Sequence, residues 1–310
     1  MKFSIFIIFI SLLIFSTSCS YLKLPIKKDY WRPPIITGTN GLVTKFIPPM
    51  PSSVFENTLF TIAFEYENVG GWDIKDGDYA LIYDKDFISL INEDERFGKV
   101  FAKGRSIYAP AGDKFRKIIK AKTYEIPFET QTTSIAIMTC WNYRTIAEAN
   151  VCVDTDIEGR LKRKPCMATN ISLTGGQGAP LAVTYIFPRF IQHEDPDKVT
   201  PIFEIQIENL GGGLVLNNPR RLCRAPERKE IFKEDFDKFV LSAQLEGWFD
   251  LRCTETPSLK EDKAKVFCSL PEGISKTLGT YVAPLKIELD YGYALVSSKT
   301  LVIEKAILKE

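Results

Sequence analysis

The sequence predicts an all-β protein with two tandem β-sandwich domains behind an N-terminal signal or anchor segment. Three observations lead to this prediction: alternation of apolar and polar residues, a motif that occurs twice, and six cysteines downstream of an apolar leader. A chain of 310 residues is long enough for two domains of ordinary size, each with its own core. Its 18 Pro, 19 Gly and 12 Tyr favour turns and strands.

The alternation is clearest at residues 59–67, where Phe60, Ile62 and Phe64 are separated by polar or small residues. A period of two is typical of a half-buried strand. Further strands are predicted at residues 41–47, 79–83, 124–128, 134–141, 149–153, 181–190, 202–208, 239–245, 265–269, 281–290 and 293–304. We expect edge strands or a short helix within residues 84–120, and a surface helix at residues 227–237.

The repeated motif divides the chain. Phe64-Glu65-Tyr66-Glu67-Asn68-Val69-Gly70-Gly71 is matched 141 residues later by Ile205-Gln206-Ile207-Glu208-Asn209-Leu210-Gly211-Gly212. In both copies an alternating strand ends in Glu-Asn, one apolar residue and Gly-Gly, residues that allow a sharp exit from a strand. The spacing predicts two related domains at residues 37–156 and 181–310, joined by a polar linker at residues 157–180.

Residues 1–19 have the features of a signal peptide or a lipoprotein signal. Lys2 precedes an apolar run at residues 3–15, which as a helix would span roughly 20 Å, less than the roughly 30 Å of a bilayer core. Small residues then precede Cys19, whose thiol we expect to be acylated, although Ser16 stands where an aliphatic residue is usual. Ordinary signal-peptidase cleavage and an uncleaved anchor are the alternatives, and all three put the remaining chain outside the cytoplasm.

The segment that follows, residues 20–36, is predicted to be a tether. Its basic residues could lie against anionic headgroups, or the segment could be a solvated spacer. Over the whole chain, 40 basic residues face 39 acidic ones, which gives a formal net charge of +1. A chain with so little net charge has no global field that would attract nucleic acid, so no nucleic-acid partner is expected.

The cysteines other than Cys19 are predicted to form disulfides. They are even in number in an exported chain, and neither a Cys-x-x-Cys motif nor a second His accompanies them, which argues against zinc. A turn expected at residues 143–147 would place Cys140 opposite Cys152, and a polar stretch would place Cys253 opposite Cys268. Elimination leaves the pair Cys166 and Cys223.

Several short strings carry a family resemblance. They are Gly38-Thr39-Asn40-Gly41-Leu42, Cys140-Trp141-Asn142-Tyr143, Val151-Cys152-Val153-Asp154, Gly175-Gly176-Gln177-Gly178-Ala179-Pro180 and Asp290-Tyr291-Gly292-Tyr293. Together with the strand-Asn-apolar-Gly motif, they resemble immunoglobulin-like, cell-adhesion-related extracellular modules of bacteria and archaea. The fuller pattern is similar to uncharacterised surface proteins of small-genome archaea. The resemblance implies tandem immunoglobulin-like β-sandwich domains on a cell surface, acting in adhesion or surface assembly, and it implies no activity.

No catalytic constellation is predicted, and no cofactor. The loop at residues 175–178 lacks the Lys-Ser/Thr of a phosphate-binding loop and favours a turn. His193 is the only histidine, and its acidic neighbours at residues 194–197 favour a solvated hairpin turn over a metal site or a triad.

Five further positions are candidates for binding or modification. Asp154 and Asp156, near the end of the first predicted domain, could contribute to a Ca²⁺ site, with a charged strand end as the alternative. Asn170 begins the only N-glycosylation sequon. Trp141 and Tyr143, beside Cys140, could form an aromatic sugar platform, but packing of the Trp against a disulfide is the commoner role.

The sequence therefore predicts a membrane-tethered, non-catalytic surface protein that binds a surface protein or a glycan, or packs into a surface structure. Two alternatives stay open. One is a secreted hydrolase or carbohydrate-active enzyme with its site at residues 84–120 or 186–200. The other is a purely structural spacer, which would show no large apolar surface patch.

Overall fold

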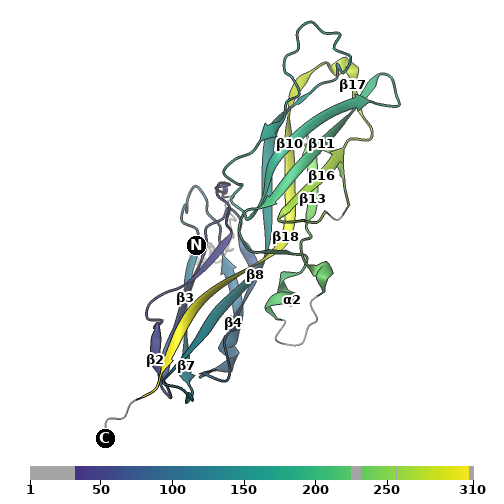
Figure 1. The fold of residues 1–310 in the computed structure, drawn as a ribbon. Coiled ribbons are helices and arrows are strands. Elements are labelled where there is room, and N and C mark those ends of the chain that lie inside the picture. Colours follow the sequence, from purple (N-terminus) through teal and green to yellow (C-terminus); the bar gives the residue numbers. More distant parts are fainter. Residues whose placement is uncertain (1–31, 225–231, 256, 307–310) are drawn as a thin grey trace, which may run out of the picture. The chain divides into compact units, whose positions relative to one another are not determined.

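The structure is a computed structural model that describes residues 32–224, 232–255 and 257–306. It confirms the predicted all-β fold class, because antiparallel sheets make up nearly all of the regular structure (Figure 1). In chain order the strands are β1 (Leu42–Phe46), β2 (Ser53–Phe55), β3 (Leu59–Asn68), β4 (Ile74–Ile82), β5 (Ile88–Leu90), β6 (Phe97–Ala102), β7 (Lys114–Thr123), β8 (Thr130–Val153), β9 (Ile171–Ser172), β10 (Leu181–Gln192), β11 (Lys198–Asn209), β12 (Leu214–Leu216), β13 (Val240–Leu245), β14 (Phe249–Asp250), β15 (Arg252–Cys253), β16 (Lys263–Ser269), β17 (Ile274–Ser275) and β18 (Tyr281–Glu304). The helices are short: α2 (Pro219–Cys223) and the 3₁₀ turns η1 (Glu93–Arg96), η3 (Lys233–Asp235) and η4 (Lys276–Leu278).

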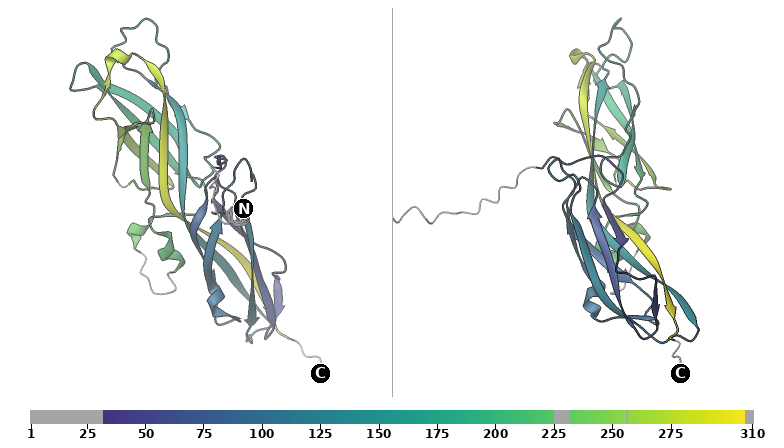
Figure 2. Two further views of the ribbon diagram at one scale, coloured as in Figure 1. Left: turned by 180° about the vertical axis from the view of Figure 1, so that it is seen from behind. Right: turned by 90° about the vertical axis from the view of Figure 1, so that its left-hand side faces the viewer.

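Three sheets form two sandwiches. A four-stranded sheet, β1-β3-β7-β5, covers one end of an eight-stranded sheet with the order β14-β13-β18-β8-β4-β6, in which β12 and β2 also pair with β18. A six-stranded sheet, β15-β16-β11-β10-β9 with β17 beside β11, covers its other end. Figure 2 shows these layers from behind and from the side. The inward-facing side chains form one continuous core that runs from Leu42 to Leu301.

Two strands of 24 residues each, β8 and β18, connect the sandwiches. They pair antiparallel along their whole length, from Tyr281 opposite Val153 to Glu304 opposite Thr130 (Figure 1). The first half of β8 and the second half of β18 therefore belong to one sandwich, and the remaining halves belong to the other. Residues 33–310 form one compact unit, and the division into domains at residues 37–156 and 181–310 stays a prediction.

The long strands differ from the sequence prediction. A turn was expected at residues 143–147, yet residues 134–141 and 149–153 lie in the single strand β8, and residues 281–290 and 293–304 in the single strand β18. The predicted strand at residues 124–128 is wrong, since these residues form an irregular connection to β8. Residues 84–120 contain the edge strands β5 and β6 and the 3₁₀ turn η1, as expected, but they also contain most of β7, an interior strand that was not predicted.

The leader, including Cys19, and most of the predicted tether lie outside the described residues. The surface helix expected at residues 227–237 falls partly outside them, and its described part contains η3. No helix in the described part of the chain has both the length and the apolar character that a bilayer crossing requires.

Candidate functional site

The outer face of the sheet β1-β3-β7-β5 carries a concentration of positive charge. Alternation along β7 points Ile119, Ala121 and Thr123 into the core and puts the residues between them on the outside. Its outward basic side chains, with one from β1, make up what we call the basic face: Lys45, Lys114, Arg116, Lys120 and Lys122. Strand register places Lys45, Glu65 and Arg116 in one row across three strands.

Glu65 holds three of these cations in place. Its carboxylate lies 3.0 Å from Arg116 Nε, 3.1 Å from Lys114 Nζ and 3.4 Å from Lys45 Nζ. The three long side chains cover the carboxylate so completely that Glu65 is only 2% exposed, although it points away from the core. The hydrogen bond from Arg116, helped by Lys114 and Lys45 and opposed by burial, lowers the pKa of Glu65 to about 2.

The basic face keeps surplus positive charge after these contacts. Among the residues that the structure describes, the acidic side chains on this face are Glu65 and Glu67, and Glu67 pairs with Lys114 at 3.3 Å. Lys120 and Lys122 are exposed and make no ion pair with any residue that the structure describes. Five cations thus face two carboxylates on one sheet, in a chain whose formal net charge is +1.

The corresponding face of the second sandwich is more aromatic. Tyr185 and Phe187 of β10 stack with ring centroids 6.0 Å apart, and Phe267 of β16 is 49% exposed. Register places Glu204 of β11 between Phe187 and Phe267. Lys265 lies 3.2 Å from this carboxylate, so this face combines exposed rings with a nearly balanced charge.

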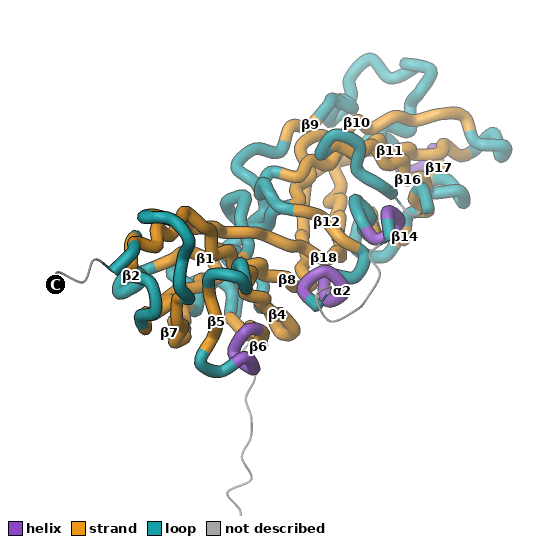
Figure 3. The backbone as a smooth tube through the Cα atoms, turned by 60° about the horizontal axis from the view of Figure 1, so that its bottom comes forward, coloured by secondary structure: helices purple, strands orange, loops and turns teal. Residues whose placement is uncertain are grey.

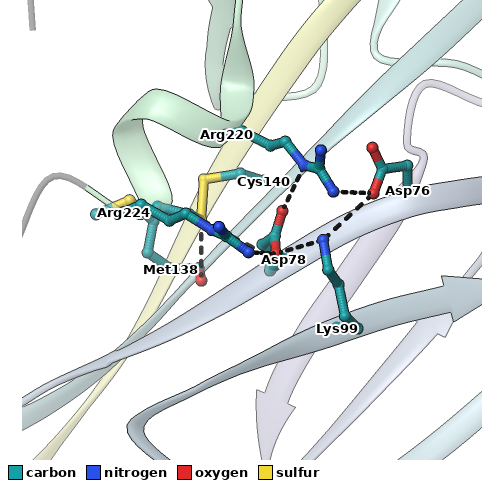
Figure 4. Close-up of polar contacts among 8 residues, drawn as sticks. Asp76, Asp78, Lys99, Met138, Cys140, Arg220 and Arg224 are labelled. Carbon is teal, nitrogen blue, oxygen red and sulfur yellow. Dashed lines mark hydrogen bonds and ion pairs between the residues drawn. A yellow bond between two sulfur atoms is a disulfide. The ribbon is translucent and has the colours of Figure 1, made fainter. Parts of the chain in front are cut away.

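A third cluster fastens α2 to the outside of the eight-stranded sheet (Figures 3 and 4). The disulfide between Cys140 of β8 and Cys223 of α2 is buried. Beside it, the almost fully buried carboxylate of Asp78 accepts contacts from Lys99 at 2.9 Å, Arg220 at 3.3 Å and Arg224 at 3.4 Å. The charges of this cluster are used within the chain, which indicates a clamp rather than a binding site.

The predicted disulfides are partly right. All six cysteines downstream of the leader are paired, and the expected bond between Cys253 and Cys268 is present. The pairing of Cys140 with Cys152 is wrong, because both lie on β8 and twelve residues of extended strand separate them by about 40 Å. Cys152 is bonded to Cys166 instead. The elimination pair Cys166–Cys223 is therefore also wrong, because Cys223 is bonded to Cys140.

Asp154 and Asp156, the Ca²⁺ candidates, hold a loop. Lys164 Nζ lies 2.7 Å from Asp154 and 3.5 Å from Asp156. Asp156 also accepts the backbone N–H groups of Arg160 and Leu161, which are the larger reason that its pKa is lowered. A lysine ammonium thus stands where a cation would be needed. Among the residues that the structure describes, no group of three or more His, Cys, Asp or Glu could hold a metal ion.

The other predicted positions fall in different places. Asn170 is exposed just before β9, as a glycosylated residue would have to be. Trp141 is 1% exposed and contacts Tyr293 at 5.4 Å between ring centroids. It points into the core while its neighbour Cys140 faces the opposite side of the sheet, so it forms neither a sugar platform nor a contact with that disulfide.

His193 and the loop at residues 175–178 both make hydrogen bonds within the chain. His193 Nδ1 accepts the N–H of Asp195 at 2.9 Å, so the ring proton is on Nε2, which donates to the carbonyl of Pro271 at 2.9 Å. Gly178 donates to the carbonyl of Gly38 and accepts the N–H of Gly71, which fixes the loop at residues 175–178. Sequence reasoning missed the basic face, although the alternation of Lys and apolar residues along β7 was a visible signal.

No protein-family model matches the chain, and no curated protein matches it. Among solved structures, a serine-rich repeat adhesion glycoprotein from Streptococcus agalactiae aligns at 7% identity and a TM-score of 0.18, over 86% of this chain and 96% of that one. A sporulation control protein from Bacillus subtilis aligns at 12% identity and a TM-score of 0.15, over 64% of this chain and 85% of that one. A non-toxic crystal protein from Bacillus thuringiensis aligns at 9% identity and a TM-score of 0.11, over 86% of this chain and 72% of that one.

The disulfides indicate the environment in which the protein is found. Three disulfides within an all-β chain are typical of proteins in an oxidising, extracellular environment.

Proposed function

We propose that this is a non-catalytic, membrane-tethered surface protein that binds an acidic polysaccharide through its basic face. The observation that carries the proposal is the excess of cations over carboxylates on the outer side of β1, β3 and β7. An extracellular location makes surface glycans accessible partners. The tether and the lipid or helix anchor remain the sequence-based expectation of residues 1–36.

The arrangement of the cations suits an extended, regularly charged chain. Lys114, Arg116, Lys120 and Lys122 lie on one face of one strand, over a length of about 26 Å. Glu65 fixes Lys114 and Arg116, so part of the entropic cost of ordering the site is met before binding. Lys120 and Lys122 have no acidic partner among the described residues that a ligand would have to displace. A flat strip of this kind favours a linear polyanion over a compact anion.

A purely structural spacer is the weaker alternative. It predicts a surface without large apolar patches, whereas Tyr185, Phe187 and Phe267 share the outer face of the second sandwich, two of them substantially exposed.

The test uses residues 33–310 with their disulfides formed, and dextran sulfate as the probe. Binding should be strong at low salt and weaken as salt rises, because counterions are released from the polyanion. Lys120→Gln with Lys122→Gln should lower the affinity roughly tenfold and make the salt dependence shallower, since two charge contacts are lost.

The matched control is Lys263→Gln with Lys265→Gln, which removes the same charge from the equivalent face of the second sandwich. It should change the affinity less than about twofold if location matters more than net charge. Equal losses in the two double variants would refute a specific basic face. Neutral dextran should not bind, and binding to vesicles with anionic lipids but not to dextran sulfate would contradict the polysaccharide proposal.

A further inference from the structure

The two copies of the repeated motif make the same hydrogen bonds. Asn68 Nδ2 donates to the carbonyl four residues ahead, Trp72 O, at 2.7 Å, and Asn209 Nδ2 donates to Gly213 O at 2.8 Å. Asn68 Oδ1 accepts the N–H two residues ahead at 3.1 Å, and Asn209 Oδ1 does so at 3.4 Å. Each Oδ1 also accepts a tyrosine hydroxyl, from Tyr143 at 3.3 Å and Tyr293 at 2.9 Å respectively.

The surroundings of the motif match as well. Asn68 donates its N–H to Asp113 O at 3.0 Å, and Asn209 donates to Asp262 O at 2.8 Å. Directly after each aspartate comes a lysine that pairs with the motif's glutamate: Lys114 with Glu67 at 3.3 Å and Lys263 with Glu208 at 3.5 Å. β3 with β7 is therefore the structural equivalent of β11 with β16.

The two tyrosines extend the equivalence to the long strands. Tyr143 is on β8 and Tyr293 is on β18, 150 residues later. The same spacing links other side chains that are fully buried in both strands: Ile135 with Leu285, Ile137 with Ile287, Val151 with Leu301 and Val153 with Ile303. The spacing is constant along both strands, so β8 and β18 are equivalent over their whole length.

The register of the pair is symmetric about its centre. Asn142 lies opposite Gly292, Tyr143 opposite Tyr291 and Trp141 opposite Tyr293. A two-fold rotation about the pair Asn142–Gly292 thus exchanges β8 with β18. Gly292 is constrained at this centre, because a Cβ there would lie 2.4 Å from Cδ of Pro219.

Only the first half of each long strand lies in the sandwich that is formed by the strands preceding it in the chain. The first half of β8 pairs with β4, and the first half of β18 pairs with β13, in the two opposite sandwiches. The second half of β18 crosses to the first sandwich, where it lies between β8 and the short strand β2. The second half of β8 crosses in the opposite direction and pairs with the first half of β18.

We propose that the chain is a fused, strand-exchanged dimer of one ancestral unit. Each unit consists of a sandwich and a long strand, and each offers a slot that fits the second half of the other unit's long strand. The surface along which the units recognise each other is the β8–β18 ribbon, and the partner that fits each slot is another copy of the same unit. The proposal does not depend on the ligand of the basic face.

The test replaces one crossing segment with its equivalent in residues 33–310. Residues 296–303 take on the residues of 146–153, except that Val302 is kept where the equivalent is the disulfide-bonded Cys152. The control inserts the same residues shifted by one position, which preserves composition but turns the buried set outward. The reciprocal variant gives residues 146–153 the residues of 296–303, with Cys152 kept.

Melting temperature by circular dichroism is the measurement. The in-register replacements should fold and melt within about 10 °C of the unmodified unit, while the shifted control should melt at least about 10 °C below its in-register counterpart. Equal destabilisation by in-register and shifted segments, in both strands, would overturn the proposal, because the two crossing segments would then not be interchangeable.

Discussion

Glu65 shows at the scale of one residue how the basic face is organised. A carboxylate on the outer side of a sheet is normally solvated, but here Lys45, Lys114 and Arg116 cover it. Contacts with these cations favour the charged form, which is why the pKa of Glu65 falls to about 2. The same contacts concentrate positive charge at the surface.

The low pKa of Glu65 predicts a pH-dependent contribution to stability. Its pKa falls from 4.5 to about 2 on folding, so the stabilisation is fully present above about pH 4.5 and is lost as the pH falls toward about 2. Glu65→Gln should reduce the free energy of unfolding by about 1–2 kcal/mol at pH 7, after allowance for screening of the three exposed cations. Urea titrations between pH 7 and pH 2 would show the gap between variant and parent closing at low pH.

A gap that stays constant from pH 5 to pH 2 would contradict this assignment. Glu208→Gln is the control, since Glu208 has one ion pair, to Lys263 at 3.5 Å, and its side chain is more exposed. The control should leave a smaller gap at pH 7.

At the scale of elements, α2 depends on its disulfide and on Asp78. A helix of five residues has too few internal hydrogen bonds to be stable alone. The Cys140–Cys223 bond closes a loop of 83 residues, and loop-closure entropy assigns it about 4.5 kcal/mol, against about 3 kcal/mol for Cys152–Cys166 with a separation of 14.

Removing Cys140–Cys223 should therefore cost more stability than removing Cys152–Cys166. Cys140→Ala with Cys223→Ala should lower the free energy of unfolding by roughly 1.5 kcal/mol more than Cys152→Ala with Cys166→Ala, measured by guanidinium titration. It should also make the segment around α2 more sensitive to limited proteolysis, because only ion pairs and the packing of Pro219 then hold it. Equal losses with unchanged proteolysis would show that α2 is held without the disulfide.

The sequence predicts well those strands in which buried and exposed side chains alternate because only one face of the strand packs on the core. Residues 59–67 are an example, since the inward Phe60, Ile62 and Phe64 alone determine the strand and nearly its ends. The sequence did not show that β8 continues through residues 143–147. At this stretch the strand passes from the core of one sandwich to the core of the other, so its pattern of buried residues changes there. The disulfide error followed from it: an assumed turn placed Cys140 opposite Cys152, whereas the chain continues straight.

The candidate site was less predictable than the fold. The lysines of β7 are visible in the sequence, but their number on one face depends on the register that brings Lys45 and Glu65 beside Arg116. That register joins residues from three strands, and the sequence of any one strand does not contain it. Asp154 and Asp156 show the converse: adjacent carboxylates resemble a cation site until Lys164, ten residues after Asp154, is placed between them.

At the scale of the whole molecule, the shared strands couple the two sandwiches. Leu285 and Leu301 are both on β18 and both fully buried, but Leu285 lies opposite Ala149 in the second sandwich and Leu301 opposite Thr133 in the first. Two sandwiches joined by a flexible linker would unfold separately. Here neither can lose its central strands without removing a strand from the other, so residues 33–310 should unfold in a single cooperative transition.

Two substitutions test this coupling. Leu285→Ala and Leu301→Ala each create a cavity and should each cost about 2–4 kcal/mol. In differential scanning calorimetry both should shift the same single peak downward, with the calorimetric and van't Hoff enthalpies remaining equal. Ile191→Ala, at a half-exposed position on the outer end of β10, is the control and should shift that peak little. Two peaks, of which Leu285→Ala moves one and Leu301→Ala the other, would show that the sandwiches unfold independently despite the strands they share.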